Sequence, residues 1–224
     1  MAFTLKKAAS ALMTGVIAAV LFVLPVSAQD TNGETFVQTL ADEATGILND
    51  ESMNDTVLVA EFQNMFIQKT AIRQFGRSAL GPYSRVATDE EFDQYIELLE
   101  QYATSIVASN LSEYSGERIV VNGSTVEERS SYAYVNVDSD VMSRNGDKIA
   151  GVRWLLIRRE GEYRLYDITV EAPAEEGTFS LLQMQREEFG SIISNNGDRI
   201  RPLLRYLRTR ITESGMTPAN HASN

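Results

Sequence analysis

The chain has 224 residues, with 31 acidic and 20 basic side chains, a formal net charge of −11, no cysteine and one histidine. This length suits one domain or a small pair of domains, and a hydrophobic content of 43% excludes a mainly disordered chain. The lack of cysteine excludes disulfide scaffolds, cysteine-ligated metals and thiol nucleophiles. The acidic balance argues against a nucleic-acid partner, because such contacts need many Lys and Arg side chains at the phosphates.

The first 28 residues have the pattern of a secretory signal peptide. Two lysines precede Ala8–Val23, a run of 16 apolar or small residues, and small residues at 26–28 resemble a cleavage site. The run is shorter than the roughly 20 residues that span a bilayer, so cleavage before Gln29 is favoured over a retained anchor. We therefore expect export to the periplasm and a single mature domain, 29–224, with 18 basic and 31 acidic residues and a net charge of −13.

Five stretches of the mature chain carry apolar residues at the spacing of a helix face. They are 34–49, 56–80, 88–111, 179–193 and 200–211. Thr88 and Glu91 form a capping box, in which each side chain satisfies a backbone group of the other, so a helix is expected to begin there. The chain from Thr212 is polar, and we expect 212–224 to be a flexible tail.

Between the third and fourth helices the composition changes to Val, Ile and Tyr, which is typical of strands. The expected strands are 118–121, 132–141, 149–159 and 163–170. Asn145-Gly146 and Glu160-Gly161 indicate tight hairpin turns between the last three. The pattern therefore predicts an α+β fold with a twisted antiparallel sheet of about four strands, covered by N- and C-terminal helices.

Few residues suit catalysis. The single histidine, His221, lies in the polar tail, which argues against a histidine-activated nucleophile. No phosphate-binding or nucleophile-elbow motif is present, and adjacent Glu pairs point to different sides of their elements, so we expect no metal site and no cofactor. Asp167 is the exception, because it lies inside an apolar strand. It is either a buried general base or an acid on the solvent side or edge of the sheet, and strand alternation favours the second.

Three segments resemble, in order, the MlaC family of periplasmic phospholipid-binding proteins, also called toluene-tolerance or ABC-transporter auxiliary proteins. The segment LGPYSRVATDEEF at 80–92 resembles the family's L-G-x-Y-W-R-x-A-S-x-x-x-x-x-F, and Y-S-G at 114–116 resembles its Y-S-G. The segment YRLYDITVE at 163–171 resembles its W-K-V-Y-D-V-x-V-E-G strand. The chain departs from the pattern at Pro82, at Ser84 where the family usually has Trp, and in the loop 172–177.

The resemblance implies a soluble, monomeric lipid carrier without bond chemistry. Its fold would resemble the nuclear-transport-factor-like and cystatin-like folds, with sheet and helices around a hydrophobic cavity that holds acyl chains. The family moves phospholipid between an outer-membrane lipoprotein–porin complex and an inner-membrane ABC transporter. Some relatives are associated with hopanoid metabolism, so the lipid need not be a glycerophospholipid.

Bulky apolar residues on the inner sides of strands and helices are candidates for lining this cavity. Strand alternation places Val152, Trp154 and Leu156 on one face, and Tyr166, Ile168 and Val170 on one face of the next strand. Ordinary core packing is the alternative for each residue, because periodicity does not separate a filled core from a cavity wall. The full set of candidates is Phe75, Leu80, Tyr83, Tyr102, Ile106, Val152, Trp154, Leu156, Tyr166, Ile168, Val170, Leu182, Phe189 and Ile193.

The last helix is rich in arginine. Its five arginines are Arg199, Arg201, Arg205, Arg208 and Arg210. They either dock the protein or touch a lipid phosphate, or they form an ordinary solvated face that suits the helix dipole, which is the simpler interpretation.

Three functions from different classes fit the sequence. A periplasmic lipid carrier is favoured. The alternatives are an isomerase or hydratase for a hydrophobic ligand, with Asp167 as its base, and a passive binding protein of the cell envelope.

Overall fold

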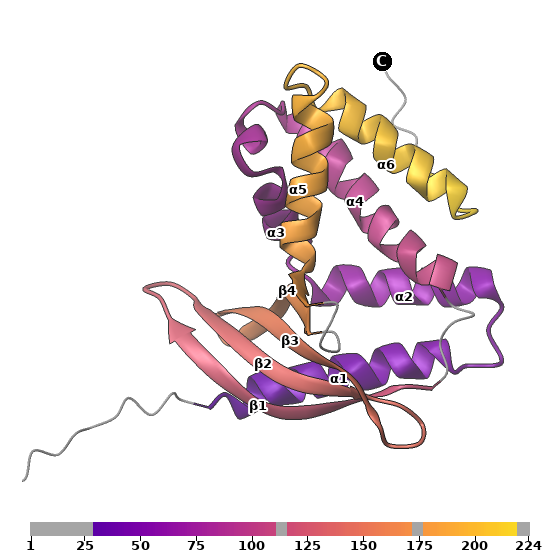
Figure 1. The fold of residues 1–224 in the computed structure, drawn as a ribbon, viewed down its shortest axis with the longest axis vertical. Coiled ribbons are helices and arrows are strands. Elements are labelled where there is room, and N and C mark those ends of the chain that lie inside the picture. Colours follow the sequence, from indigo (N-terminus) through magenta and orange to yellow (C-terminus); the bar gives the residue numbers. More distant parts are fainter. Residues whose placement is uncertain (1–28, 111–115, 172–176, 219–224) are drawn as a thin grey trace, which may run out of the picture.

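The computed structural model describes residues 29–110, 116–171 and 177–218 (Figure 1). One antiparallel sheet contains all strands in chain order. The strands are β1 (Arg118–Glu128), β2 (Ala133–Met142), β3 (Lys148–Arg159), β4 (Glu162–Glu171) and β5 (Thr178–Ser180). The helices are α1 (Thr31–Leu48), α2 (Asp55–Lys69), α3 (Ile72–Leu80), the short 3₁₀ helix η1 (Gly81–Arg85), α4 (Asp89–Asn110), α5 (Leu181–Ser194) and α6 (Arg201–Glu213). The predicted α+β class is confirmed, whereas the expected signal peptide and His221 lie outside the described residues.

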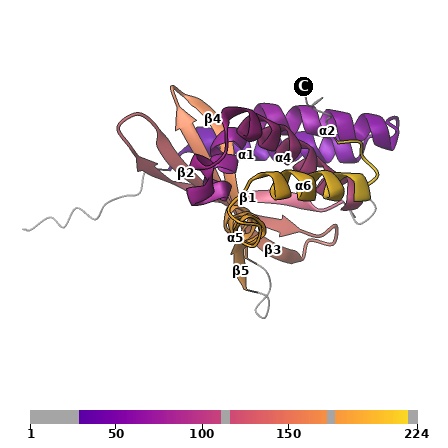
Figure 2. The same ribbon diagram turned by 90° about the horizontal axis from the view of Figure 1, so that it is seen from above.

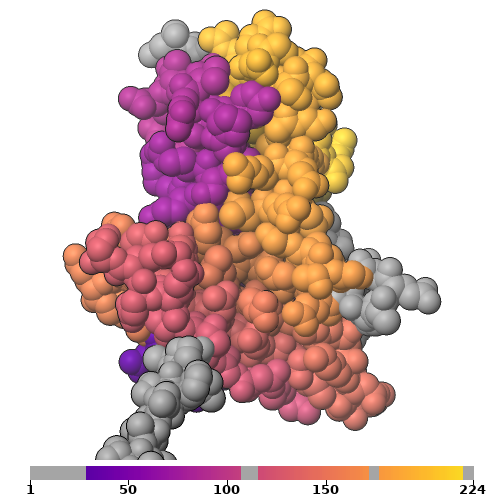
Figure 3. All heavy atoms as spheres, turned by 60° about the vertical axis from the view of Figure 1, so that its left-hand side comes forward, coloured from indigo at the N-terminus to yellow at the C-terminus, as the bar shows by residue number. Residues whose placement is uncertain are grey.

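The molecule has two parts along its long axis. The sheet forms one end, with α1 and α2 beside it, while α3, α4, α5 and α6 form a helical column at the other end (Figure 1). Helix α5 runs along the long axis away from β5 and is seen end-on from above (Figure 2). The space-filling view shows the same division, with strand residues forming a broad base under the column (Figure 3).

Local capping signals account for most helix starts. Asp30 and Asn54 accept hydrogen bonds from the backbone N–H groups of Gly33 and Val57, so they cap α1 and α2. The predicted capping box at α4 is confirmed, since the Thr88 N–H donates to Glu91 Oε2 (3.2 Å) and the Glu91 N–H donates to Thr88 Oγ1 (3.1 Å).

The single helix predicted over 56–80 is wrong, because the chain breaks into α2 and α3. Thr70 leaves the helix in an extended conformation and forms a parallel bridge with Leu165 of β4. The Ala71 N–H donates to the Leu165 carbonyl oxygen at 2.7 Å. The break therefore places both helices against the edge of β4. In the sequence, the helical spacing of apolar residues continues through this position, so the spacing does not indicate the break.

Three element ends also differ from the prediction. Strand β1 continues to Glu128 instead of ending at Val121, through a register shift at Gly123. Residues 179 and 180 were expected at the start of a helix, but they belong to β5, which pairs with 169–171 of β4. Helix α6 continues to Glu213, two residues beyond the predicted end; the flexibility of the tail stays a prediction.

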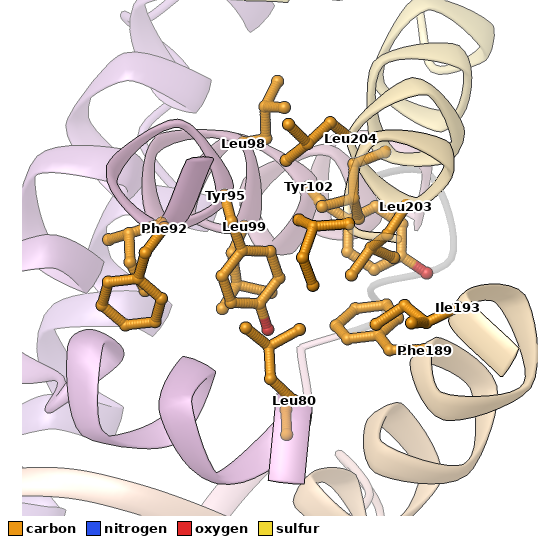
Figure 4. Packing of buried hydrophobic residues seen from close by; sticks show 14 of the residues in the cluster. Leu80, Phe92, Tyr95, Leu98, Leu99, Tyr102, Phe189, Ile193, Leu203 and Leu204 are labelled. Carbon is orange, nitrogen blue, oxygen red and sulfur yellow. The ribbon is translucent and has the colours of Figure 1, made fainter. Parts of the chain in front are cut away.

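The helical column has its own hydrophobic core, here called the helical cluster. Tyr95 is fully buried at its centre, where its ring lies edge-on to Phe189 at 6.0 Å between centroids and its hydroxyl donates to the Gly76 carbonyl oxygen (Figure 4). The buried members are Ile72, Ala79, Leu80, Phe92, Tyr95, Ile96, Leu98, Leu99, Tyr102, Phe189, Ile193, Ile200, Leu203, Leu204, Leu207 and Ile211. These buried residues come from α3, α4, α5 and α6 and from Ile200 just before α6.

A second core, here called the sheet-face cluster, lies between α1, α2 and one face of the sheet. Its buried members are Val37, Leu40, Met65, Val135, Val137, Leu156 and Leu165. It shares no buried residue with the helical cluster. The described residues therefore form two separate hydrophobic cores.

Candidate functional site

The inner face of the sheet is only partly covered by helices. Helix α1 packs mainly on β1 and β2, with Phe36 stacked on Tyr163 of β4, and α2 meets the sheet at β4. Val137 and Leu156 are fully buried, but Trp154 and Ile168, which pair across β3 and β4, are only half-buried. Large apolar side chains on a strand face normally pack against another layer, so this region is an incompletely covered hydrophobic surface.

We call this surface the apolar strip and define it by Ile47 of α1, Phe62 of α2, Trp154 of β3 and Ile168 of β4. All four are partly buried and pack against the sheet-face cluster. A hydrophobic ligand that covers them would remove further apolar area from water at about 25 cal/mol per Å². A hydrocarbon ligand would therefore gain hydrophobic energy by covering the strip.

Trp154 is held in a fixed position within the strip. Its indole Nε1–H donates to Ser139 Oγ at 2.8 Å, and the Ser139 hydroxyl donates to the Val152 carbonyl oxygen at 3.2 Å. Ser139 itself is buried, so both polar groups are satisfied away from water. The ring then offers its apolar surface to the strip without an unpaired donor.

The opposite face of the sheet is polar and carries ion pairs. Arg153 Nε donates to Asp138 Oδ1 at 2.7 Å, and Lys148 Nζ lies 2.6 Å from Asp140 Oδ1. These residues alternate with the inward-facing ones along β2 and β3. The chemistry of the two faces therefore differs, and only the inner face suits an apolar ligand.

Open grooves exist elsewhere on the described surface. The largest of three, about 840 Å³, lies between α2 and the end of α6, and the others are about 450 and 410 Å³. None of the three is lined by the residues of the apolar strip. These three grooves therefore do not open onto the strip.

One comparison with known proteins identifies a family. A family model described as MlaC protein matches residues 38–209, most of the chain. The chain belongs to the MlaC family. A similar solved structure is the phospholipid-binding protein from Ralstonia solanacearum in complex with a phospholipid, with a TM-score of 0.67, 16% identity, and coverage of 81% of this chain and 98% of that chain. No curated protein matches the sequence significantly.

The described residues of this MlaC-family chain show neither a metal site nor a membrane span. Within 29–110, 116–171 and 177–218, no three His, Asp or Glu side chains gather where a metal ion could bind. Over the same ranges, no helix is long and apolar enough to cross a membrane.

The structure divides the predicted lining residues between the two cores. The inner face of the sheet, where the sheet-face cluster lies, carries Val152, Trp154, Leu156, Ile168 and Val170. The helical cluster holds Phe75, Leu80, Tyr83, Tyr102, Leu182, Phe189 and Ile193. Ile106, on the C-terminal half of α4, is 47% exposed. The predicted residues are therefore not one continuous wall, and their contact with a lipid stays a prediction.

The predicted position of Tyr166 beside Ile168 and Val170 is wrong. The β3–β4 register shifts between Leu155 and Leu156, which leaves Tyr166 as an extra residue in β4. Its ring packs against Tyr134 on the polar face, 6.2 Å between centroids, and its hydroxyl donates to Ser78 Oγ at 2.7 Å. Tyr166 thus joins the sheet to α3 instead of facing the strip.

The structure gives Asp167 a structural role. Its Oδ1 accepts hydrogen bonds from the backbone N–H groups of Ile168 (2.8 Å) and Leu182 (2.9 Å), and its Oδ2 accepts one from the Ser180 hydroxyl (2.7 Å). Ser180 is in turn the N-cap of α5. The carboxylate therefore fixes the first turn of α5 to β4, and it also suits the positive end of the helix dipole.

Ile47 and Phe62 are strip residues that the sequence-based selection did not include. Both fit the helical apolar pattern, but that pattern marks only the buried side of each helix. Which buried side meets the sheet and which meets α4 depends on how the helices pack. The break at Thr70 turns α2 against β4, and this is the information that the pattern lacks.

A polar network fixes the start of α1 beside the sheet-face cluster. The Asp30 carboxylate caps α1 and accepts hydrogen bonds from the Tyr163 hydroxyl (2.8 Å) and from Arg158 Nη1 (2.7 Å). Burial acts to raise the pKa of Asp30, but the Gly33 N–H, Tyr163 and Arg158 together outweigh it and hold the pKa below its usual value. The backbone N–H of Asp30 donates to Ser124 Oγ at 2.7 Å, so the network also fastens α1 to β1.

Proposed function

We propose that this protein is a periplasmic phospholipid carrier that holds acyl chains on the apolar strip between the sheet and helices α1 and α2. The incompletely covered apolar face is the observation that carries the proposal. Membership of the MlaC family and the likeness to a structure solved with a phospholipid support it. No bond needs to be made or broken in this role.

The energetics of hydrocarbon burial explain why such a carrier is needed. Two acyl chains contain about thirty CH₂ groups, and at about 0.8 kcal/mol each they oppose transfer through water by more than about 20 kcal/mol. The strip offers side chains from α1, α2, β3 and β4 on one surface. Loading then requires α1 or α2 to move away from the sheet, while Trp154 keeps its place through Ser139.

The predicted export signal and the charge of the predicted mature chain fit transport between membranes. A mature net charge of −13 opposes adsorption to anionic lipid surfaces, which attract basic segments. The carrier would exchange lipid with protein complexes, an ABC transporter of the inner membrane and a lipoprotein-containing complex of the outer membrane. A phospholipid is the proposed cargo; a hopanoid or another lipid would be recognised by extraction of the purified protein and mass spectrometry.

Trp154 is the sole tryptophan, so it reports directly on ligand binding at the strip. We expect a phospholipid with brominated acyl chains to quench its fluorescence saturably, because bromine quenches only near contact. A headgroup-matched lipid without bromine should leave the fluorescence unquenched. This first prediction is measured by titration of the mature protein.

The matched control moves the reporter away from the strip. Trp154→Phe combined with Val86→Trp places the only indole at an exposed position in the helical column. This variant should bind the same lipid, as measured by extraction, without quenching. Equal quenching of both proteins, or no lipid bound by either, would refute the proposed site.

A further inference from the structure

Helix α6 begins at the end of the molecule opposite the sheet (Figure 1), and most of the arginines at 199–210 are exposed. Residues 199–210 contain five of the 20 basic residues of a chain whose net charge is −11. Helix α6 alone has four arginines and one glutamate. A positive surface of this kind on an acidic protein is a feature that the lipid site does not use.

A groove of about 450 Å³ lies at this surface, at the turn between α5 and α6. Arg199, Arg201 and Arg205 line it, together with Val86, which is 54% exposed. We call these four residues the arginine face. Arginine beside exposed apolar area is typical of protein–protein contact surfaces.

The arginine face is rigid before any partner binds. Leu203, Leu204 and Leu207 are buried in the helical cluster, so α6 is fixed to α4. The turn before α6 is closed by the Asp198 N–H, which donates to the Ile193 carbonyl oxygen at 3.0 Å. Arg199 Nε donates to the Asn196 carbonyl oxygen at 3.1 Å. A fixed surface loses little conformational entropy on binding.

The charges of the arginine face are not fully neutralised within the protein. Arg201 pairs with Glu91 at 3.3 Å, yet the Arg201 side chain stays 80% exposed, and Asp198 is the other acid at the groove. Among the residues that the structure describes, no carboxylate lies within ion-pair distance of Arg205. At least one guanidinium is therefore free to bind an external anion.

The chemistry of the face favours carboxylates on a protein over a lipid surface. Guanidinium groups bind carboxylates in a bidentate manner, which fixes orientation as well as charge. A membrane-binding surface typically adds lysines and aromatic residues, and neither type lines this groove. The negative charge of the rest of the molecule also opposes a bilayer.

We infer that the arginine face docks an acidic protein surface of the membrane complexes that exchange lipid with this carrier. The inference rests on the proposed function. Because the face lies at the end of the molecule away from the sheet, a bound partner leaves the apolar strip uncovered (Figure 1). Docking at the face would then orient the carrier without blocking the lipid.

The test compares two double variants of the mature protein on membrane vesicles from the organism that makes it. Arg201→Gln/Arg205→Gln removes charge from the face, while Arg159→Gln/Arg164→Gln removes the same charge from exposed positions of the β3–β4 hairpin. We expect the first variant to associate about tenfold more slowly at low salt, and the second to match the unmodified protein. Amidation of the exposed carboxylates of the vesicles should abolish the difference.

Three outcomes would overturn the inference. They are unchanged association of Arg201→Gln/Arg205→Gln, an equal loss in the hairpin variant, and undiminished binding to protease-treated vesicles or to phosphatidylglycerol vesicles without protein. Quenching of Trp154 by brominated lipid is measured on the same variants and should not change. If lipid binds but docking is unaffected, the inference that the arginine face docks a partner is refuted. If no lipid binds, the proposed carrier function is refuted.

Discussion

Replacing Asp30 should destabilise the protein strongly, although the residue lies next to the expected mature N-terminus. Its side chain is 5% exposed and joins three elements, because it caps α1 and binds Tyr163 of β4 and Arg158 of β3. Asp30→Ala removes all of these interactions at once. Asp30→Asn keeps the shape and an acceptor for the cap but removes the charge.

The expected loss can be worked from these contacts. An N-cap contributes about 1 kcal/mol, and breaking a fully buried ion pair costs about 3–5 kcal/mol. Arg158 is 27% exposed and keeps Glu128 as a partner, so its share is smaller. We expect Asp30→Ala to lower the free energy of unfolding by about 3 kcal/mol, or the Tm by roughly 6–12 °C for a domain of this size. Asp30→Asn should lose about half as much.

Urea unfolding followed by Trp154 fluorescence measures this loss, with Glu61→Ala on the exposed side of α2 as the control. The pH dependence supplies a stricter test. Because the folded pKa of Asp30 is lowered, its charge stabilises the protein above the unfolded pKa of about 4, and this contribution is lost as the pH falls through the folded pKa. The difference between the unmodified protein and Asp30→Asn should therefore shrink between pH 5 and strongly acidic pH. A constant difference, or a loss equal to that of Glu61→Ala, would refute the reasoning.

The remaining predictions concern Asp167 and two glycines. Asp167→Ala should lower the free energy of unfolding by about 2–3 kcal/mol, measured in urea, and leave quenching by brominated lipid intact; loss of lipid binding in a fully folded variant would contradict its structural role. Gly76→Ala should destabilise by about 1–3 kcal/mol, because the new Cβ would lie 2.6 Å from Ile96 Cδ1. Gly46→Ala, whose Cβ meets nothing within 4 Å, should instead raise the melting temperature slightly, and similar shifts in both variants would show that packing around Gly76 is loose.

Local signals explain what the sequence predicted correctly. The capping box at Thr88 and Glu91 and the hairpin turn at Glu160-Gly161 are set by residues within a few positions of each other, and both occur as expected. Glu160 and Gly161 both have positive φ, 53° and 85°, which is the conformation that a two-residue hairpin turn requires. The antiparallel pairing of β3 with β4 follows from this turn.

The features that were missed depend on residues far away in the sequence. The break at Thr70 exists because Leu165 offers a backbone partner, and β5 exists because β4 has a free edge beside it. The displacement of Tyr166 likewise follows from a bulge in the pairing of β3 with β4. The spacing of apolar residues within one helix or strand does not show which distant residues it will contact.

Prediction of the candidate site from the sequence is limited in the same way, because the pattern does not show how the helices pack. Leu80 and Phe189 have the same size and periodicity as true strip residues, yet they are sealed within the helical cluster. Trp154 and Ile168 were identified correctly as inward-facing, because strand alternation does not depend on which helix covers them. Assigning helix residues to one core or the other requires the three-dimensional arrangement.

The separation of the two hydrophobic cores has a consequence for the proposed carrier in its unloaded state. Departure of the cargo would change the surroundings of the sheet-face cluster, whereas none of the buried residues of the helical cluster comes from α1 or α2. An empty molecule therefore retains an intact scaffold of α3 to α6 on which α1 and α2 can reseat. Repeated rounds of uptake and delivery then require only a local rearrangement, never a return to the unfolded chain.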